Sequence, residues 1–543
     1  MSDRSMKQRT YNILFHTHTV SGIVISVVLY VIFFAGSFAF FRDEFVNWER
    51  NSGVDVTDHI TFSFDHLLDS VGQNYNLYGR DIELSKYYIE DRVSVNMTGT
   101  QSKTAASEDQ LPKFFYYTPT DNSEATYAAS YTLGEFLYRL HFLAQIKYPI
   151  GYYLAGLIAF FFLFAIITGF LVHWKKIVSN FYIFRPMAKA KTIWTDAHTA
   201  LGMIGLPFQF VYAVTGAFFM IKAILIAPNV FLLFNGDQEK FYAELGYSHP
   251  HSKFIDERDA ANYSIDEFVE TTRDRWPGFN VTQVHLFNYQ TTDMQLLVEG
   301  HLPYRSKFNG TGQALYQVNS GKLISERSPL EKASYLEAVK NILYRIHYGD
   351  YGGYALRIIS FLLGIISCFV IISGVMIWLV ARDKKHIPEK RRRFNEKVAR
   401  VYMAIALSML PVTALSFIAV KIFEPQGQSF IINFYGITWL LFTIFYILKK
   451  DLSFINRNTL LLGAVFGLLI PITNGIKTGN WPWVSYEKGL YHIFFTDVFW
   501  IILPILLLFA WKKTLKSGGP GGIPQKKVSK KTIPTKPIAE AVN

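Results

Sequence analysis

The stretch that decides the fold is ITGFLVHWKKIVSNFYIFRPMAKAKTIWTDAHTALGMIGLPFQFVYAVTG, at residues 167–216. It closes one apolar run, crosses a loop rich in lysine and arginine, and opens a second apolar run. His173 and His198 mark the two junctions. Long apolar runs cross membranes as helices, and basic loops stay on the cytoplasmic side. The stretch therefore predicts two membrane-spanning helices joined by a cytoplasmic loop.

Both flanks of this stretch recur elsewhere in the chain. HTALG at 198–202 matches HTVSG at 18–22, and each is followed at the same spacing by a second glycine. LYRLH at 137–141 matches LYRIH at 343–347. The chain is therefore predicted to be a tandem repeat built around four histidines: His18, His198, His141 and His347.

Composition indicates an all-α polytopic membrane protein. Half of the 543 residues are apolar and 18% are charged, and eight apolar runs are long enough to cross a hydrocarbon core of about 30 Å as helices. The net charge of +12 does not indicate nucleic acid, because lysine and arginine cluster beside the ends of these runs. The single cysteine, Cys368, excludes an intrachain disulfide or a thiolate cluster, so a redox metal would need histidine. The predicted spans lie near 20–41, 149–172, 200–227, 355–380, 399–421, 430–448, 458–476 and 490–511.

Basic residues set the predicted orientation. Lys7, Arg9 and the basic stretches 175–191 and 382–393 fall inside by the positive-inside rule. Both termini are then cytoplasmic, and two long connections lie outside. The predicted domains are the first transmembrane helix (1–42), a first outer domain (43–135), helices two and three with their basic loop (136–227), a second outer domain (228–340), helix four (341–385), a C-terminal four-helix module (386–511) and a basic, disordered cytoplasmic tail (512–543).

Each outer connection is predicted to form a small α+β domain, with one helix on a short antiparallel sheet. Domains of this kind bind or position a partner, and nothing in either segment has the pattern of a catalytic site. The predicted elements are a helix at 64–71 with strands at 82–89, 93–97 and 114–118, then a helix at 264–275 with strands at 279–289 and 294–300 and a hairpin at 314–324.

His18 and His198 form the inner pair, about one turn inside the cytoplasmic ends of the first and third spans. Each has a glycine four residues later, which removes a side chain from the same helix face and leaves room for a flat ring. A single site of this kind would be read as a headgroup-facing histidine; a repeated one favours a ligand pair. His173, whose counterpart in the repeat is Trp378, is either a competing ligand of the inner site or a headgroup contact.

His141 and His347 form the outer pair, each at the end of a Leu-Tyr-Arg-Leu/Ile-His word. Pro149 in the first copy, and two glycines in the second, are predicted to break the helix after each histidine. The arginines two residues earlier, Arg139 and Arg345, are suited to neutralise acidic groups such as haem propionates. The alternative is that these words are ordinary interfacial anchors of tyrosine and arginine.

Two histidine pairs, one at each membrane face, match the needs of two bis-histidine b-type haems, because neutral imidazoles supply both axial ligands. A zinc site usually needs three or four convergent ligands, and the first four spans have no matching interior carboxylates. A transporter usually has broken helices or buried charge at the midplane, and these features are sparse here. The sequence therefore favours electron transfer across the membrane.

Several sequence motifs resemble those of the PepSY-associated transmembrane family, whose members are often described as iron-regulated inner-membrane proteins of Gram-negative bacteria. They are HTxxG with a distal glycine, FRDEFVNWER at 41–50, LYRLH at 137–141, and the opening stretch itself. The resemblance covers roughly residues 10–385 and is most specific across 135–220. The family's histidine positions would fall on His18, His141, His173, His198 and His347.

The resemblance implies two extracytoplasmic PepSY-like domains and, from members resembling ferric-siderophore reductases, haem-dependent reduction of ferric siderophores in the periplasm. Gln209 departs from the pattern, since a histidine commonly follows Pro-Phe in related members. The last four helices lie outside the resemblance and are expected to be a docking or quinone-facing module.

The expected protein is a diheme reductase of iron chelates in the bacterial inner membrane, surrounded by lipid. No GxGxxG nucleotide-binding word is visible, so the electrons would come from a quinol or a cytoplasmic reductase. One alternative is a non-enzymatic membrane protein whose PepSY-like domains bind an envelope partner or a peptidase. Another is a siderophore or metal transporter.

Overall fold

Eight long helices form the membrane-spanning part of the computed structural model. The structure describes residues 7–516 apart from residues 55, 175–178, 180–181, 183–184, 186–187, 189, 245–252, 260 and 424–426. Within these described residues, eight helices are long and apolar enough to cross a membrane, as predicted. They are α1 (Gln8–Ala39), α5 (Ile150–His173), α7 (Ala190–Phe234), α11 (Gly353–Arg382), α12 (Glu389–Ile422), α13 (Gln428–Lys449), α14 (Leu452–Thr478) and α16 (Tyr491–Lys516).

Several of these helices are longer than the apolar runs that predicted them. α1 begins at Gln8 and α12 at Glu389, each about ten residues before its apolar run. Polar residues at a helix end face water without breaking the backbone hydrogen bonds, so the helix continues past the membrane. Much of the basic loop at 175–189 lies outside the described residues.

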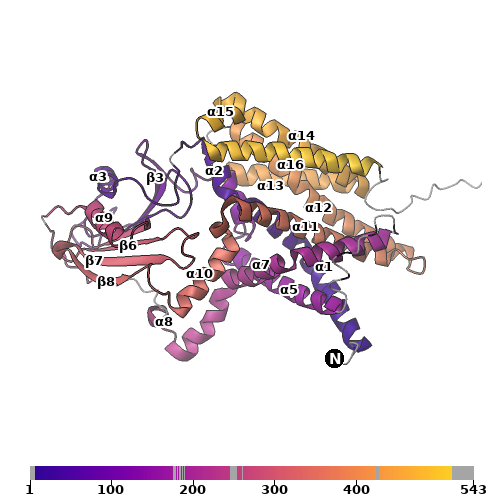
Figure 1. The fold of residues 1–543 in the computed structure, drawn as a ribbon, viewed down its shortest axis with the longest axis horizontal. Coiled ribbons are helices and arrows are strands. Elements are labelled where there is room, and N and C mark those ends of the chain that lie inside the picture. The colour runs from indigo at the N-terminus through magenta and orange to yellow at the C-terminus, as the bar shows by residue number, and fades with distance from the viewer. Residues whose placement is uncertain are drawn as a thin grey trace, which may run out of the picture.

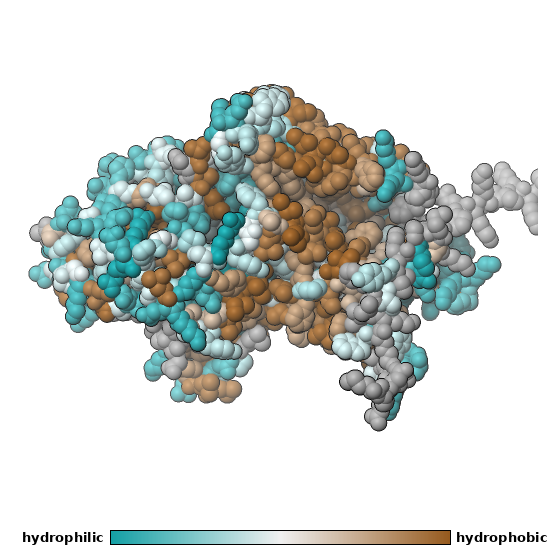
Figure 2. All heavy atoms as spheres, viewed as in Figure 1, coloured by the Kyte–Doolittle hydropathy of each residue, from teal (hydrophilic) through white to brown (hydrophobic). Residues whose placement is uncertain are grey.

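The spans form two groups. α1 packs against both α5 and α11, and α7 packs against the same two helices, so these four close into a ring. In the second group α12 packs against α13 and α14, and α14 packs against α16. The second group is the C-terminal module. Figure 1 shows it alongside the first group, with the sheet at one end of both. Figure 2 shows hydrophobic surface over the helices and hydrophilic surface over the sheet.

The two outer segments share one antiparallel sheet of eight strands, in the order β4-β3-β2-β1-β5-β6-β7-β8. The sequence predicts two separate domains, but β1 pairs with β5, with Ile82 opposite Leu286. A separate four-stranded sheet would expose β1 as an unpaired edge, and this pairing removes two such edges. The strands are β1 (Ile82–Ser85), β2 (Val93–Met97), β3 (Lys113–Thr118), β4 (Ser123–Ala125), β5 (Asn280–Phe287), β6 (Gln295–His301), β7 (Thr311–Gln317) and β8 (Lys322–Arg327).

Two helices pack on the sheet, α3 (Phe64–Asn74) and α9 (Ile265–Arg275). Their apolar sides and alternate strand residues form one buried core. Ser63 and Ser264 cap the two helices by accepting hydrogen bonds from backbone amides of the first turn. The sheet is therefore a rigid cap on the end of the helix bundle.

Short helices connect the sheet to the bundle. α4 (Leu133–Leu140) follows β4 and leads into α5, and α10 (Tyr335–Tyr348) follows β8 and leads into α11. Each begins with a capping residue and a glutamate three positions later, Thr132 with Glu135 and Ser334 with Glu337. The other short helices are α2 (Arg42–Arg50), α8 (Gln238–Glu244), α15 (Pro482–Glu487), η2 (Val318–Ser320) and η3 (Asp350–Gly352).

Candidate functional site

The inner pair lies within the four-helix ring, at the end away from the sheet. His18 on α1 and His198 on α7 have ring centres 6.2 Å apart, with their planes at 67°. Nδ1 of His18 lies 2.8 Å from the carbonyl oxygen of Ala165 on α5. Nδ1 of His198 lies 2.9 Å from the carbonyl oxygen of Val370 on α11. Each imidazole of the inner pair is thus held by a carbonyl group of a neighbouring helix.

The outer pair lies where the sheet meets the bundle. His141 follows the last turn of α4, and His347 lies in the last turn of α10. Their ring centres are 6.5 Å apart, with the planes at 31°. Nδ1 of His141 contacts the carbonyl oxygen of Tyr138, and Nδ1 of His347 lies 2.8 Å from Oγ1 of Thr215 on α7. As predicted, the helices break after both histidines, because α5 begins at Ile150 and α11 at Gly353.

Burial keeps the outer histidines neutral. It lowers the pKa of His141 to about 4 and the pKa of His347 to about 3, since charging a ring away from water is unfavourable. A neutral imidazole has one protonated nitrogen and one nitrogen with a free lone pair. Nδ1 is the nitrogen engaged with a neighbour in all four rings, so Nε2 is the one available to a metal.

The ring separations fit bis-histidine ligation. A metal–imidazole bond is about 2.0 Å long, and the bonded nitrogen lies about 1.1 Å from the ring centre, so two rings on opposite sides of one ion have centres about 6.2 Å apart. The observed separations are 6.2 Å and 6.5 Å. A ligating histidine normally uses its other ring nitrogen to bond a carbonyl or a similar group, which fixes its orientation. The residues present therefore fit two haems.

Glycines make room for the histidine rings. A Cβ on Gly169 would lie 2.9 Å from Cε1 of His18, and a Cβ on Gly374 would lie 3.4 Å from Cε1 of His198. A Cβ on Gly36 would lie 3.7 Å from Cβ of His141. Gly36 is the second glycine that follows HTVSG at 18–22. A Cβ on Gly22, four residues after His18, would meet nothing within 4 Å, and one on Gly202, four residues after His198, would meet Cγ1 of Val370 at 4.0 Å.

The two pairs lie near opposite ends of the ring. The eighteen-residue step along α1 from His18 to Gly36, which contacts His141, corresponds to about 27 Å of helix. This length approaches the thickness of the hydrocarbon core, about 30 Å. The pairs are therefore separated by a distance close to the thickness of a membrane's hydrocarbon core.

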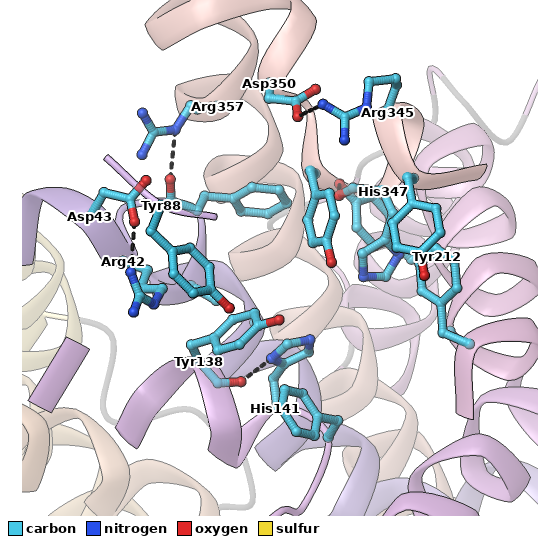
Figure 3. A pocket seen from close by; sticks show the side chains of 18 of the residues that line it. Arg42, Asp43, Tyr88, Tyr138, His141, Tyr212, Arg345, His347, Asp350 and Arg357 are labelled. Atoms are coloured by element: carbon cyan, nitrogen blue, oxygen red, sulfur yellow. Dashed lines mark hydrogen bonds and ion pairs between the residues drawn. The ribbon is translucent and has the colours of Figure 1, made fainter. Parts of the chain in front are cut away.

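A cavity of about 1040 Å³ opens at the outer pair. His141 and His347 both project into it, as Figure 3 shows. Several tyrosines and arginines also line the cavity. The cavity continues to the sheet, where Lys86 and Tyr87 line it from the first half and Tyr304 from the second. Its volume is at the upper end of ordinary ligand pockets, about 300–1,000 Å³.

Arg42 anchors one wall of this cavity. It is 5% exposed and makes ion pairs of 2.8 Å with Glu90 and with Glu135. Its guanidinium lies 3.5 Å from the ring centre of Tyr88. Burial opposes the ionisation of Glu90, but Arg42, Arg92 and other arginines hold its pKa at about 2. Arg42 therefore connects the cavity wall to an ionised Glu90.

The predicted arginines Arg139 and Arg345 both line the cavity. Arg139 lies 4.0 Å from Glu135, and Arg345 contacts Asp350 and stacks 3.9 Å from the ring centre of Tyr304. Sequence reasoning missed several other lining residues because their partners are remote in the chain. The missed residues are Arg42, Glu44, Arg357, Tyr88 and Tyr138. For Arg42 and Glu44 a signal was present in FRDEFVNWER, where charges directly follow an apolar span.

His173 and Gln209 stand apart from the two pairs. His173 closes α5 within electrostatic range of His198, while the ring contact of the inner site joins His198 to His18. Gln209, 5% exposed, donates a hydrogen bond of 3.1 Å to Ser367 Oγ on α11. Across the described residues, no three or more histidine, cysteine or carboxylate side chains gather as a non-haem metal site would need.

A family model described as the PepSY-associated TM region matches residues 15–381. The chain belongs to this family. The match spans both histidine pairs, the shared sheet and the cavity, and confirms the resemblance seen in the sequence. It ends before α12, so the C-terminal module of this PepSY-associated protein lies outside it. No curated protein matches the chain.

Proposed function

We propose that this PepSY-associated membrane protein holds two b-type haems, one between the histidines of each pair, and reduces ferric chelates such as ferric siderophores on the side of the sheet. The observation that carries the proposal is the ring separation of 6.2 Å and 6.5 Å in two pairs, with Nδ1 engaged in every ring. Haem bound at these positions supplies one-electron chemistry, since its iron cycles between the ferric and ferrous states.

The histidines and their neighbours fix the ligands. The carbonyl oxygens of Ala165 and Val370 accept the Nδ1 proton in the inner pair. The carbonyl oxygen of Tyr138 does so for His141, and Oγ1 of Thr215 for His347. Each bond selects the tautomer with a free Nε2 lone pair and orients the ring toward its partner.

The part of the cavity beside the sheet is the proposed chelate site, since a haem between His141 and His347 would occupy the part next to those rings. Its arginines, including Arg139 and Arg345, are placed to neutralise carboxylates at the outer site. Its tyrosines offer flat surfaces and hydroxyl groups to a bulky polar ligand. On the side of the sheet, Lys86 and Tyr87 line the cavity. An electron that reaches the outer pair would thus meet a chelate held within contact distance of it.

The basic flanks support an orientation in the bacterial inner membrane. Lys7, Arg9 and the run Arg391 to Arg393 lie at the ends of helices opposite the sheet. Both termini are then cytoplasmic and the two PepSY-like halves of the sheet are periplasmic. The electron donor is proposed to be a quinol or a cytoplasmic reductase, acting at the inner pair.

The proposal has a direct test. The purified protein is reduced under anaerobic conditions, freed of reductant and mixed with a ferric hydroxamate in the presence of a chromogenic ferrous chelator. Reoxidation of the protein with stoichiometric appearance of the ferrous complex is the expected result. His347→Ala should abolish it, and the exposed His386→Ala, which changes a histidine outside both pairs, should not.

Two alternatives predict other results. A binding protein for an envelope partner or a peptidase would show no reoxidation, and its histidine variants would behave alike. A siderophore or metal transporter would move the ferric chelate into vesicles without a redox change. Either result, obtained with wild-type protein, would replace the proposed function.

A further inference from the structure

The nine-residue helix α2 joins parts of the molecule that are remote in sequence. It follows α1 directly and packs against both α4 and α16. Its first residues, Arg42 to Glu44, line the outer cavity. Later in the helix, Asn47 and Trp48 face the C-terminal module. A displacement of α2 would therefore move residues of the cavity wall.

A buried polar network ties α2 to the C-terminal module. Trp48 is fully buried, and its Nε1 donates a hydrogen bond of 2.8 Å to Asp497 Oδ1 on α16. Asn474 on α14 donates to the other carboxylate oxygen at 2.9 Å. Nζ of Lys421 on α12 donates to the carbonyl oxygen of Trp48 at 2.5 Å and lies 4.5 Å from the centre of its ring. Two helices of the module, α12 and α16, thus contact Trp48 of α2 directly, and α14 supports the contact through Asp497.

Such a network is costly within a membrane protein. Lys421 and Asp497 are both 0% exposed, and ionisable groups at this depth are rare unless they have a role. A leucine-rich interface would hold the helices together without this cost. The polar network also fixes the position of α2, because each hydrogen bond can form in only one register of α2 against the module.

On its other side α2 holds the outer site. Glu44 pairs with Arg357 on α11 at 2.5 Å. Asn47 Nδ2 donates to the carbonyl oxygen of Ile89 at 2.7 Å, beside Glu90 in the Arg42 network. Glu49 Oε2 accepts a hydrogen bond of 2.7 Å from the backbone N–H of Leu133. Leu133 is the first residue of α4, and His141 directly follows the end of that helix.

We infer that the C-terminal module is a positioning scaffold for the outer cavity: Trp48, Lys421 and Asp497 hold α2, and α2 holds the arginine wall and the helix that leads to His141. This assigns a role to the module that lies outside the family match. The inference rests on the proposed function only in taking the cavity as the chelate site. The three residues touch neither the histidines nor the cavity and act through α2.

The test uses the full chain and two readouts. Hydrogen exchange is measured over 42–50 and 133–140, and KM and kcat are measured for reduction of a ferric hydroxamate. Asp497→Leu removes the acceptor of the Trp48 N–H, while Asp497→Asn keeps an amide oxygen in the same place. Tyr446→Phe is the matched control, because it removes a buried hydrogen bond of 2.8 Å, to Asn458, in the same module away from α2.

Loss of a buried hydrogen bond should raise local opening about tenfold. Asp497→Leu should therefore exchange about tenfold faster in both segments and show a raised KM with a smaller change in kcat. Asp497→Asn should stay within about twofold of wild type, and Tyr446→Phe should leave both segments unchanged. If Asp497→Leu fails to accumulate, Trp48→Phe replaces it, since an aromatic ring remains while the N–H donor is lost together with the five-membered ring.

The inference is overturned if Asp497→Leu or Trp48→Phe exchanges like wild type over both segments, or if faster exchange is confined to α14 and α16. Failure of the proposed function is a separate result. In that case wild-type protein reduces no chelate and the KM comparison lapses, but the exchange comparison still decides whether the module positions α2.

Discussion

Asp65 and Asp266 cap each other's helices across the centre of the sheet. Asp65, on α3, accepts hydrogen bonds from the backbone N–H of Ile265 at 2.7 Å and from Ser264 Oγ at 2.6 Å. Asp266, on α9, accepts from the backbone N–H of Phe64 at 2.7 Å and also from Ser63. The two halves of the sheet are therefore joined by one contact made twice, at matching positions.

Removing either cap should destabilise this junction. Asp65→Ala and Asp266→Ala should each lower the free energy of unfolding by about 0.5–2 kcal/mol, the usual range for a lost N-cap. The double variant should lose less than the sum, because both caps close one interface. Thermal unfolding of the full chain measures this, with the exposed Asp69→Ala on α3 as the control. Equal midpoints for the control and the cap variants would contradict the account.

Each histidine pair should hold its haem independently. His141→Ala should lose the outer haem and His198→Ala the inner one, so that each variant retains about half of the wild-type haem, since a bis-histidine site needs both ligands. His173→Ala should keep both, because the ring contact joins His18 to His198. Haem is quantified per chain after purification. Loss of the inner haem in His173→Ala with its retention in His18→Ala would change the axial pairing.

Gly169 is expected to be essential to the inner site. A Cβ on Gly169 would lie 2.9 Å from Cε1 of His18, closer than real contacts allow, so Gly169→Ala should displace the ring and weaken or remove the inner haem. The outer haem should be unaffected. Gly436→Ala on α13 is the control, since a Cβ there meets nothing within 4 Å. Unchanged inner-site spectra in Gly169→Ala would show that α5 can move away from His18.

Glu90 should give the junction between sheet and bundle an acid-sensitive component. Its pKa lies at about 2 against an ordinary 4.5, so its stabilising effect is complete above about pH 4.5 and is lost as the pH falls toward 2. Thermal midpoints of wild type should drop across this window. Glu90→Gln should be less stable at pH 7, because three buried or half-buried arginines each lose one charged partner, and should change less below pH 4.5. Parallel curves for the two proteins would refute this origin of the acid sensitivity.

Much of the architecture was predictable because it rests on short-range signals. Apolar run length predicted eight spans, and all eight are confirmed. Period-two patterns predicted most strands, and β2 has the predicted bounds, Val93–Met97. The repeated words predicted that His18 would approach His198 and His141 would approach His347, and both contacts are present.

What could not be predicted depends on partners distant in the chain. The pairing of β1 with β5 joins two edges that look alike in sequence, and no local pattern records it. The Arg42 network needs Glu90 and Glu135, and the contact of Trp48 with Asp497 links α2 to α16, near opposite ends of the chain. A lone aspartate or lysine in an apolar run marks a buried site, but its partner emerges only when the helices pack.

The most direct test of the central claim is the visible difference spectrum of purified protein, dithionite-reduced minus air-oxidised, with haem quantified per chain. The account predicts sharp b-type bands at about two haems per chain, as two bis-histidine sites require. Colourless protein, expressed with ample haem, would contradict the account and leave the histidine pairs as packing contacts.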